Sequence, residues 1–398
     1  MGMVLEGVRV LDLTRVVAGP ACTRTLADYG AEVWKVEPPE GDLMRRGVPK
    51  ANGVALPFAQ QNAGKSHLCI DLSQIRGQEL VRSLAREADI VVENYRPGVA
   101  TRLGIGYDAL SADNPRLVYC SISGYGQTGP ASNRRAYAPI IHAELGLLAL
   151  NARERGTEPM PEAVSHVDFA VGSQACSAIL AALFHRERSG RGQHVDVSMA
   201  ETMLATNEFA AIEVNGGMGD LISPFRPGKA ALLKLANGDY VQVPGNPTTW
   251  IFPVARALGK LQELEQRGWH NPADTQGQDE QIRELMQEWA SVFDSVTEFE
   301  RALDSARIPL GVVKPVADVP QEAWAQSRGA FVDVDVNGTS RLIPRSPTRY
   351  SDSETGPRTG AYPRGAHNRE VLGRVLGLSN AELDELEQAD VLQSETVS

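Results

Sequence analysis

The chain has 398 residues, of which 42% are hydrophobic and 22% charged, and its formal net charge is −11. This composition is typical of a folded globular protein of about two to three domains, and the acidic balance argues against broad nucleic-acid binding, which needs a basic surface. The N-terminus has no basic segment leading into an apolar one, and no uncharged apolar run approaches membrane-spanning length, so we expect a cytoplasmic protein.

The first third of the chain alternates predicted strands with predicted helices. Strands are expected at 8–13, 32–37, 66–72, 89–93 and 116–122, with helices at 22–29, 75–88 and 107–112. Strands separated by helices predict βαβ units and a parallel, doubly wound sheet of the Rossmann type. Ligands of such sheets bind beyond the carboxyl ends of the strands, so the site is to be sought in the loops 16–20, 38–44, 94–98 and 124–130.

These loops lack the glycine fingerprints of dinucleotide and P-loop proteins, because Ala18-Gly19-Pro20 follows the first strand where GxGxxG would stand. They collect cationic residues instead: Lys35, Arg45, Arg46, Lys65, Arg96 and Arg102. Such a cluster suits phosphate groups, although each residue taken singly could be a solvated charge, which is the better interpretation of Arg45 or Arg46 alone. Lys65 and Arg102 are the better candidates because each lies near a glycine-bearing turn beside a strand.

The cysteines give no sign of a metal site. Cys22, Cys69, Cys120 and Cys176 are far apart, without CxxC spacing or a nearby histidine pair. The sequence therefore predicts neither a zinc site nor a disulfide framework, and we expect each cysteine to be a small core residue.

A single carboxylate, Asp168, precedes a strongly patterned helix. From Gly172 onward apolar residues recur at three- and four-residue spacing, as on one buried helical face. Asp168 is therefore expected at or just before the first turn, where the helix dipole favours a negative charge by ~0.3–1 kcal/mol and keeps it ionised at neutral pH. On this local pattern alone, Asp168 is better interpreted as an N-cap than as a nucleophile.

A series of ordered blocks closely resembles the family III CoA-transferases, which include formyl-CoA and carnitine CoA-transferases and the related α-methylacyl-CoA racemases. The blocks are 11–22, 30–42, 62–66, 92–98, 123–130 and the segment around Asp168, with further likeness at 307–313 and 365–372. Nearly the whole chain is covered, and an ordered series is more specific than any single motif.

The resemblance implies a large Rossmann-like CoA-binding domain over 1–224, a small α+β domain over 225–325 and a C-terminal return to the large domain over 326–398. It also implies a homodimer of interlocked rings. The sequence itself supports the small domain modestly, through a predicted turn and strand at 236–243 and an amphipathic helix at 282–293.

The resemblance also implies an acyl-CoA:carboxylate CoA-transferase that moves CoA between carboxylic acids through aspartyl anhydride and aspartyl-CoA thioester intermediates at Asp168. Coenzyme A then enters as the acyl-CoA donor, and the second partner is a small carboxylic acid. Tyr137 matches a tyrosine near the acyl group, with a packed tyrosine at a helix start as an equal alternative. The residues implied in CoA binding are Val16 and Ala18 by their backbones, Lys65 near the phosphates, Arg102 and Leu103 around the nucleotide, and Arg96.

Departures from the family pattern bear on the substrate. Val17 stands where formyl-CoA transferases carry glutamine, and the chain has no polyglycine run, so oxalate or formate is not expected. The racemases place Gly-His-Asp where this chain has Arg135-Ala136-Tyr137-Ala138, which removes their acid/base histidine. A racemase or isomerase is still the alternative, because His142 and His166 are near in sequence, although a polar helix face suits His142 better. A CoA-binding protein without catalysis is a third interpretation.

The acceptor acid is not readable from the sequence. Arg134, Arg135 and Arg226 could bind the second carboxylate of a dicarboxylic acid through bidentate hydrogen bonds, or they could be solvated.

Overall fold

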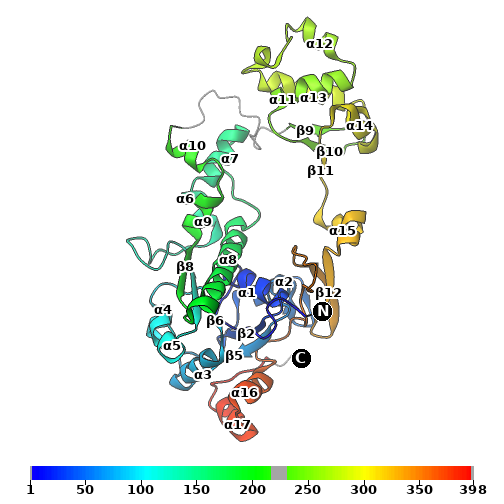
Figure 1. The fold of residues 1–398 in the computed structure, drawn as a ribbon. Helices are drawn as coiled ribbons and strands as arrows, with labels where there is room; N and C mark the ends of the chain where they lie inside the picture. The colour runs from blue at the N-terminus through cyan, green and yellow to red at the C-terminus, as the bar shows by residue number, and fades with distance from the viewer. Residues whose placement is uncertain (1, 217–230, 396–398) are drawn as a thin grey trace. The chain divides into compact units, whose positions relative to one another are not determined.

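The computed structural model describes residues 2–216 and 231–395, which form two compact units. The first unit takes in the described residues of Met1–Gly146, Pro161–Glu208 and Ala323–Ser398, and the second those of Leu147–Met160 and Phe209–Glu322 (Figure 1). The boundary predicted between 224 and 225 lies outside the described residues. The C-terminal boundary predicted after 325 lies close to the observed end of the second unit, whereas nothing in the sequence reading assigned Leu147–Met160 to it.

A parallel sheet of six strands forms the centre of the first unit, as far as the described residues show, with the order β5-β2-β1-β6-β7-β8. All five neighbouring pairs are parallel, which confirms the predicted doubly wound sheet. The strands are β1 (Arg9–Asp12), β2 (Glu32–Glu37), β5 (Ser66–Cys69), β6 (Ile90–Glu93), β7 (Val118–Ser123) and β8 (His194–Ser198).

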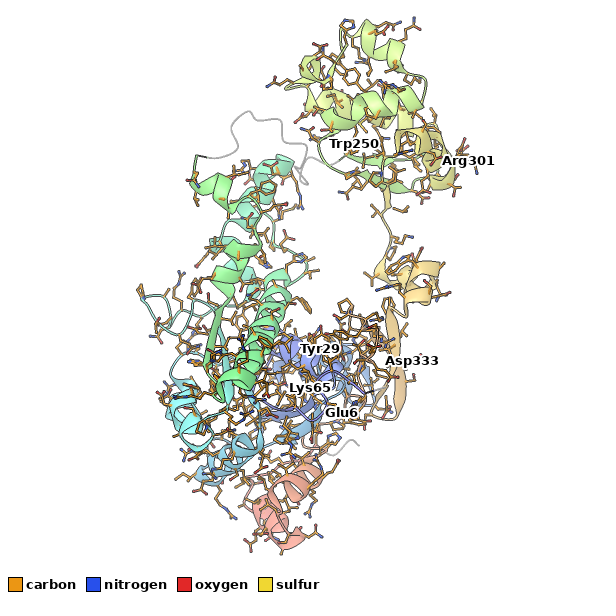
Figure 2. All side chains as sticks on the ribbon, in the orientation of Figure 1. Glu6, Tyr29, Lys65, Trp250, Arg301 and Asp333 are labelled. Carbon is orange, nitrogen blue, oxygen red and sulfur yellow. The ribbon has the colours of Figure 1, made fainter. Side chains whose placement is uncertain are left out.

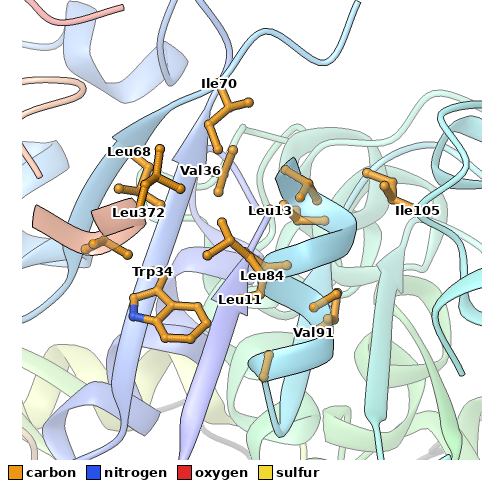
Figure 3. Close-up of a cluster of buried hydrophobic side chains, with 14 of the residues drawn as sticks. Leu11, Leu13, Trp34, Val36, Leu68, Ile70, Leu84, Val91, Ile105 and Leu372 are labelled. Atoms are coloured by element: carbon orange, nitrogen blue, oxygen red, sulfur yellow. The ribbon is translucent and has the colours of Figure 1, made fainter. Parts of the chain in front are cut away.

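One face of the sheet carries the core cluster drawn in Figure 3. Leu11, Trp34 and Leu68 from the strands meet Leu84 of α3 (Ile75–Glu87) and Leu372 of α16 (Asn368–Leu376), all fully buried. Most residues of β1, β2, β5, β6 and β7 are buried, as expected of parallel strands that are covered on both faces. The C-terminal segment, with α17 (Asn380–Gln388), thus returns to the first unit, since α16 packs on α3 and β5.

Helices α1 (Ala18–Asp28) and α8 (His166–Ser189) pack against each other in the first unit, and α8 also contacts β7 and β8. Their approach is close at Gly172, where an added Cβ would lie 2.7 Å from the carbonyl oxygen of Ala18. By length and composition, α8 is the one described helix that could cross a membrane, contrary to the expectation of no such run. A core helix passes the same test, and the packing of α8 against α1, β7 and β8 buries part of its apolar surface.

Shorter elements complete the first unit. The loop after β2 forms a 3₁₀ turn at Leu43–Arg46, and a small hairpin packs beneath α2 around Phe58. The elements are β3 (Lys50–Ala51), β4 (Val54–Ala55), α2 (Leu56–Asn62), α4 (Val99–Arg102), α5 (Tyr107–Asp113), α6 (Ala138–Glu144), α9 (Met199–Thr206), α15 (Ala323–Arg328), β12 (Phe331–Val336) and β13 (Thr339–Pro344).

The second unit has its own core, built around Leu233, Ile251 and Trp289. Its described strands form an antiparallel sheet in the order β11-β10-β9, and the core residues Ile251 and Trp289 come from helices. The helix predicted at 282–293 is α13 (Asp279–Ala290), and the strand within 236–243 is β10 (Tyr240–Val243). The other elements are α7 (Leu147–Arg155), α10 (Ala210–Val214), β9 (Ala231–Lys234), α11 (Pro247–Ala257), α12 (Leu261–Gln266), α14 (Val296–Leu303) and β11 (Gly311–Val312).

Candidate active site

A pocket of about 250 Å³ lies in the first unit beyond the carboxyl ends of the central strands. The chain leaves β1 toward β2 and leaves β6 toward β7, so the β1/β6 junction is the point where the strand order reverses. The loops after β1 and β6 diverge there and leave room for a ligand. Five of the predicted site residues line this pocket together: Val16, Ala18, Arg96, Tyr137 and Asp168.

Asp168 lies in the first turn of α8 and projects into this pocket. The N-cap is Ser165, so the interpretation of Asp168 as a cap is wrong. Among the described residues, Asp168 is the one carboxylate that lines the pocket, and its side chain makes no hydrogen bond or ion pair with any of them. A carboxylate that is held in place without an internal partner is available to react with a ligand.

Burial raises the pKa of Asp168 to about 6. The helix dipole, which was expected to favour the charged form, is outweighed by the loss of water around the half-buried carboxylate. Asp168 is therefore still largely ionised at neutral pH, by a margin of only about one pH unit.

A histidine from α6 takes over the capping that Ser165 does not provide. His142 is buried, and its Nε2 accepts the backbone N–H of Val167 over 3.3 Å, one residue before Asp168. Nε2 must be unprotonated to accept, and burial together with the nearby His166 lowers the pKa of His142. The expected polar-face position for His142 is thus wrong, and neither histidine lines the pocket.

The loops after β1 and β6 are tied to each other by Asn94. Its Oδ1 accepts the backbone N–H of Arg15 over 2.9 Å, and its Nδ2 donates to the carbonyl of Arg15 over 2.8 Å. Sequence reasoning placed Asn94 in a family block but gave it no role. Its position directly after a predicted strand was the available signal.

Unpaired arginines surround the site. A second pocket of about 440 Å³ shares Arg15 and Arg96 with the first and adds Arg102. The guanidinium groups of these three residues are exposed and form no ion pair within the described parts of the chain. Arg15 was missed as a site residue, although it follows the first predicted strand at the switch point.

Two predicted CoA-binding residues are not brought to these pockets. Lys65 is fully buried inside the first unit (Figure 2), where its ammonium donates to Asp12, Thr23 and Asn62 over 2.8 to 3.0 Å. Burial lowers the pKa of Lys65 to about 8, against the attraction of Asp12. Leu103 packs against the core cluster of Figure 3. Both positions are those of structural residues.

The structure also places the predicted tyrosine, the arginines considered for a dicarboxylate and the cysteines. Tyr137 is 58% exposed and precedes α6, so the alternative of a packed tyrosine is wrong. Of the arginines considered for a dicarboxylate, Arg135 lines the pocket, Arg134 also lines it but is paired with Glu144, and Arg226 lies outside the described residues. All four cysteines are buried and free, as expected of core residues.

Comparison with known proteins identifies the family. The model of CoA-transferase family III matches residues 5–368. The chain is 28% identical to the beta subunit of succinyl-CoA–L-malate CoA-transferase from Chloroflexus aurantiacus, with 98% of each chain covered. It is 32% identical to succinyl-CoA:glutarate CoA-transferase from Mus musculus, over 98% of this chain and 90% of that protein.

Further relatives agree. Formyl-CoA:oxalate CoA-transferase from Streptomyces avermitilis is 31% identical over 98% of this chain and 100% of that protein. A crystal structure of a CAIB/BAIF family protein from Brucella suis matches with a TM-score of 0.81 and 29% identity, over 94% of this chain and 100% of that chain. The chain therefore belongs to CoA-transferase family III and is a CoA-transferase.

Proposed function

We propose that this enzyme is an acyl-CoA:carboxylate CoA-transferase in which Asp168 is the covalent nucleophile. The observation that carries the proposal is the lone, unpaired and partly dehydrated carboxylate of Asp168 in a pocket at the switch point of the sheet, bordered by unpaired arginines. Relatives named as succinyl-CoA:malate and succinyl-CoA:glutarate CoA-transferases support transfer between carboxylic acids.

In the proposed reaction, a carboxylate oxygen of Asp168 attacks the thioester carbonyl of the donor. The C–S bond breaks, CoA leaves as the thiolate, and an aspartyl anhydride forms. The thiolate then attacks the aspartyl carbonyl and releases the donor acid, which gives an aspartyl-CoA thioester. The acceptor carboxylate then attacks the aspartyl-CoA thioester and expels the CoA thiolate, which gives a second anhydride. The thiolate attacks the acceptor's carbonyl in this anhydride, which forms the new acyl-CoA and regenerates Asp168. Weak solvation of Asp168 favours its attack on the carbonyl.

The pocket residues suit the two substrates. Arg15, Arg96 and Arg102 line the two pockets and would bind the phosphates of CoA, because guanidinium groups match phosphate oxygens with paired hydrogen bonds. Val16 and Ala18 line the same pocket, and their backbones would border the pantetheine arm, with Tyr137 near the acyl group. Arg135 would bind the second carboxylate of a dicarboxylic acceptor, in keeping with the acids in the relatives' names.

A substrate panel tests the proposal. Succinyl-, acetyl- and branched acyl-CoA donors are each mixed with small mono- and dicarboxylic acids, and new thioesters are detected by mass spectrometry. Hydroxylamine or borohydride should trap an aspartyl adduct on the peptide that contains Asp168. Failure to transfer CoA between any pair would refute the proposal. Solvent deuterium entering the α-carbon of a branched acyl-CoA without acceptor would instead indicate the racemase, although no histidine lines the pocket.

The homodimer of interlocked rings and the cytoplasmic location are part of this proposal. Sedimentation of the purified chain tests whether it is a dimer. Fractionation of cells that express the chain tests the cytoplasmic location. A monomer with full activity would contradict the dimer.

The pH dependence of turnover tests the state of Asp168. Because only the ionised carboxylate attacks and burial raises its pKa to about 6, kcat should fall roughly tenfold per pH unit below about pH 6 and level off above about pH 7. Initial rates at saturating substrate, from about pH 4.5 to about pH 8.5, measure this profile. A decline that begins only near pH 4, where ordinary carboxylates titrate, would contradict the assignment.

Removal of the shared arginines should weaken CoA binding. Arg15→Ala combined with Arg96→Ala is expected to raise KM for the acyl-CoA about 10- to 100-fold, because each charge-assisted hydrogen bond contributes about 1.5–3 kcal/mol when fully formed and solvent screening at these exposed arginines reduces that contribution. Titration calorimetry with CoA measures the same loss without turnover. Arg191→Ala, at an exposed arginine outside both pockets, is the matched control. Equal KM values in the double variant and this control would exclude the phosphate assignment.

A further inference from the structure

The loop between β1 and α1 holds a residue in an unfavourable conformation. Val16 has φ = 69°, in the left-handed region that a β-branched side chain rarely adopts. Strained backbone of this kind persists only where the surrounding structure enforces it, and it concentrates at functional sites. Val16 also lines the pocket together with Asp168, so whatever enforces this conformation shapes the pocket wall.

Asp42 holds Val16 in this conformation. The backbone N–H of Val16 donates to Oδ1 and Oδ2 of Asp42 over 3.1 and 3.2 Å. On its other side the same carboxylate is paired with Lys35, whose Nζ lies 3.2 Å from Oδ2, and both side chains are fully buried. Lys35 in turn donates to the carbonyl of Thr14 over 2.8 Å, so the loop is fastened at two points.

Neighbouring groups fix Asp42 in turn. Its Oδ1 accepts the N–H of Met44 over 2.9 Å, and its own N–H donates to Glu37, which is bound by Arg45. Although burial lowers the pKa of Lys35, the facing carboxylates of Asp12, Asp42 and Glu37 raise it overall, so Lys35 stays charged. Asp42 is thus a hydrogen-bond acceptor whose position is set before any ligand arrives.

We propose that Asp42 is a positioning residue for the transfer reaction, acting through the N–H of Val16 and without touching substrate. Released from Asp42, Val16 would relax to negative φ and shift Val17 and Ala18, and with them the wall of the pocket that contains Asp168. This inference rests on the proposed function. Asp42 is neither a cation that could bind phosphate nor the proposed nucleophile. Its proposed role is to hold the backbone of Val16, and the sequence alone did not indicate this role.

A double-mutant cycle with Val16→Gly tests the proposal. With valine at position 16, Asp42→Asn should lower kcat/KM about 10- to 100-fold, because small misplacements at a reacting centre reduce rates by such factors. With glycine at position 16, the same change should lower kcat/KM at most about threefold, because glycine adopts positive φ without strain. Asp42→Asn with Lys35→Met removes both buried charges and serves if the single variant folds poorly. Equal losses in both backgrounds, or unchanged kcat/KM, would overturn the proposal.

Asp71→Asn is the matched control. Its Oδ1 accepts a backbone N–H two residues on, from Ser73 over 2.9 Å, as Asp42 does from Met44, but its side-chain partners Ser73 and Gln74 do not line the pocket. Turnover of Asp71→Asn should equal that of the unaltered enzyme. Loss of turnover in Asp71→Asn comparable to that in Asp42→Asn would assign the effect to general stability and overturn the positioning role.

Hydrogen exchange at Val16 separates this inference from the proposed function. In Asp42→Asn the Val16 amide should exchange at least about tenfold faster than in the unaltered protein, since its acceptor is weakened. Unchanged exchange would refute the role of Asp42 even in an active enzyme. If the unaltered chain transfers no CoA, the proposed function fails, and exchange still decides whether Asp42 holds Val16.

Discussion

Asp168→Asn is expected to lower kcat by about 10³-fold or more, because an amide cannot attack the thioester and no anhydride can form. The change is nearly isosteric, and the Asp168 side chain makes no hydrogen bond within the described residues that the substitution could break. The measurement is kcat with the best substrate pair from the panel, together with intact-protein mass after trapping. KM for the acyl-CoA should change little, since the arginines are untouched.

Asp113→Asn is the control for this experiment. Asp113 forms an exposed ion pair with Arg86, of a kind that contributes about 1 kcal/mol or less, so turnover should be unchanged. Full activity of Asp168→Asn, or an adduct that still forms on its peptide, would exclude Asp168 as the nucleophile. Equal losses in both variants would point to damaged folding instead.

The stability of Asp168→Asn distinguishes a lost nucleophile from a damaged fold. Because the pKa of Asp168 is raised in the folded state, the folded protein binds this proton more tightly than the unfolded chain, and the charged form costs stability above about pH 6. Asparagine should therefore raise the free energy of unfolding by about 1–2 kcal/mol at pH 8, with a gain that fades toward pH 4. Denaturant unfolding at the two pH values measures it.

The strand and helix alternation of the first unit was predictable because buried parallel strands and amphipathic helices leave different periodicities. Of the site, the residues that follow strands were the most predictable, since chain topology alone brings Val16 and Arg96 to one edge of the sheet. Asp168 needed the family blocks, because its local pattern resembles a cap.

The positions of several site candidates could not be predicted, because they depend on which side chains are buried and paired in the folded protein. Lys65 and Lys35 look like phosphate-binding residues in the sequence, yet each is enclosed with an aspartate, Lys65 with the distant Asp12 and Lys35 with Asp42 in the loop that follows its own strand. A lysine beside a glycine turn gives no sign of whether its ammonium points outward or into the core. The same holds for His142, whose contact with Val167 depends on how α6 packs against α8.

The close contact of α8 with α1 should also control the position of Asp168. Gly172 lies one helical turn after Asp168, and a Cβ at this position would lie 2.7 Å from the carbonyl oxygen of Ala18 and 3.1 Å from the Cβ of Ala21. Gly172→Ala is therefore expected to force the two helices apart and to lower kcat about 10- to 100-fold, since displacement near 1 Å can cost about 10² in rate. Steady-state kinetics with the best substrate pair measure the loss.

The sign of the stability change makes the Gly172 experiment decisive. Overpacking at Gly172 costs about 1–3 kcal/mol, which equals or exceeds the gain of about 1 kcal/mol that alanine brings to a helix. In α16, Gly373→Ala meets only the carbonyl oxygen of Leu378 at 3.5 Å, so it should stabilise the protein by about 0.5–1 kcal/mol without affecting kcat. If Gly172→Ala behaved like Gly373→Ala in both measurements, the contact with Ala18 would not be what places Asp168 beside the Val16–Ala18 wall of the pocket.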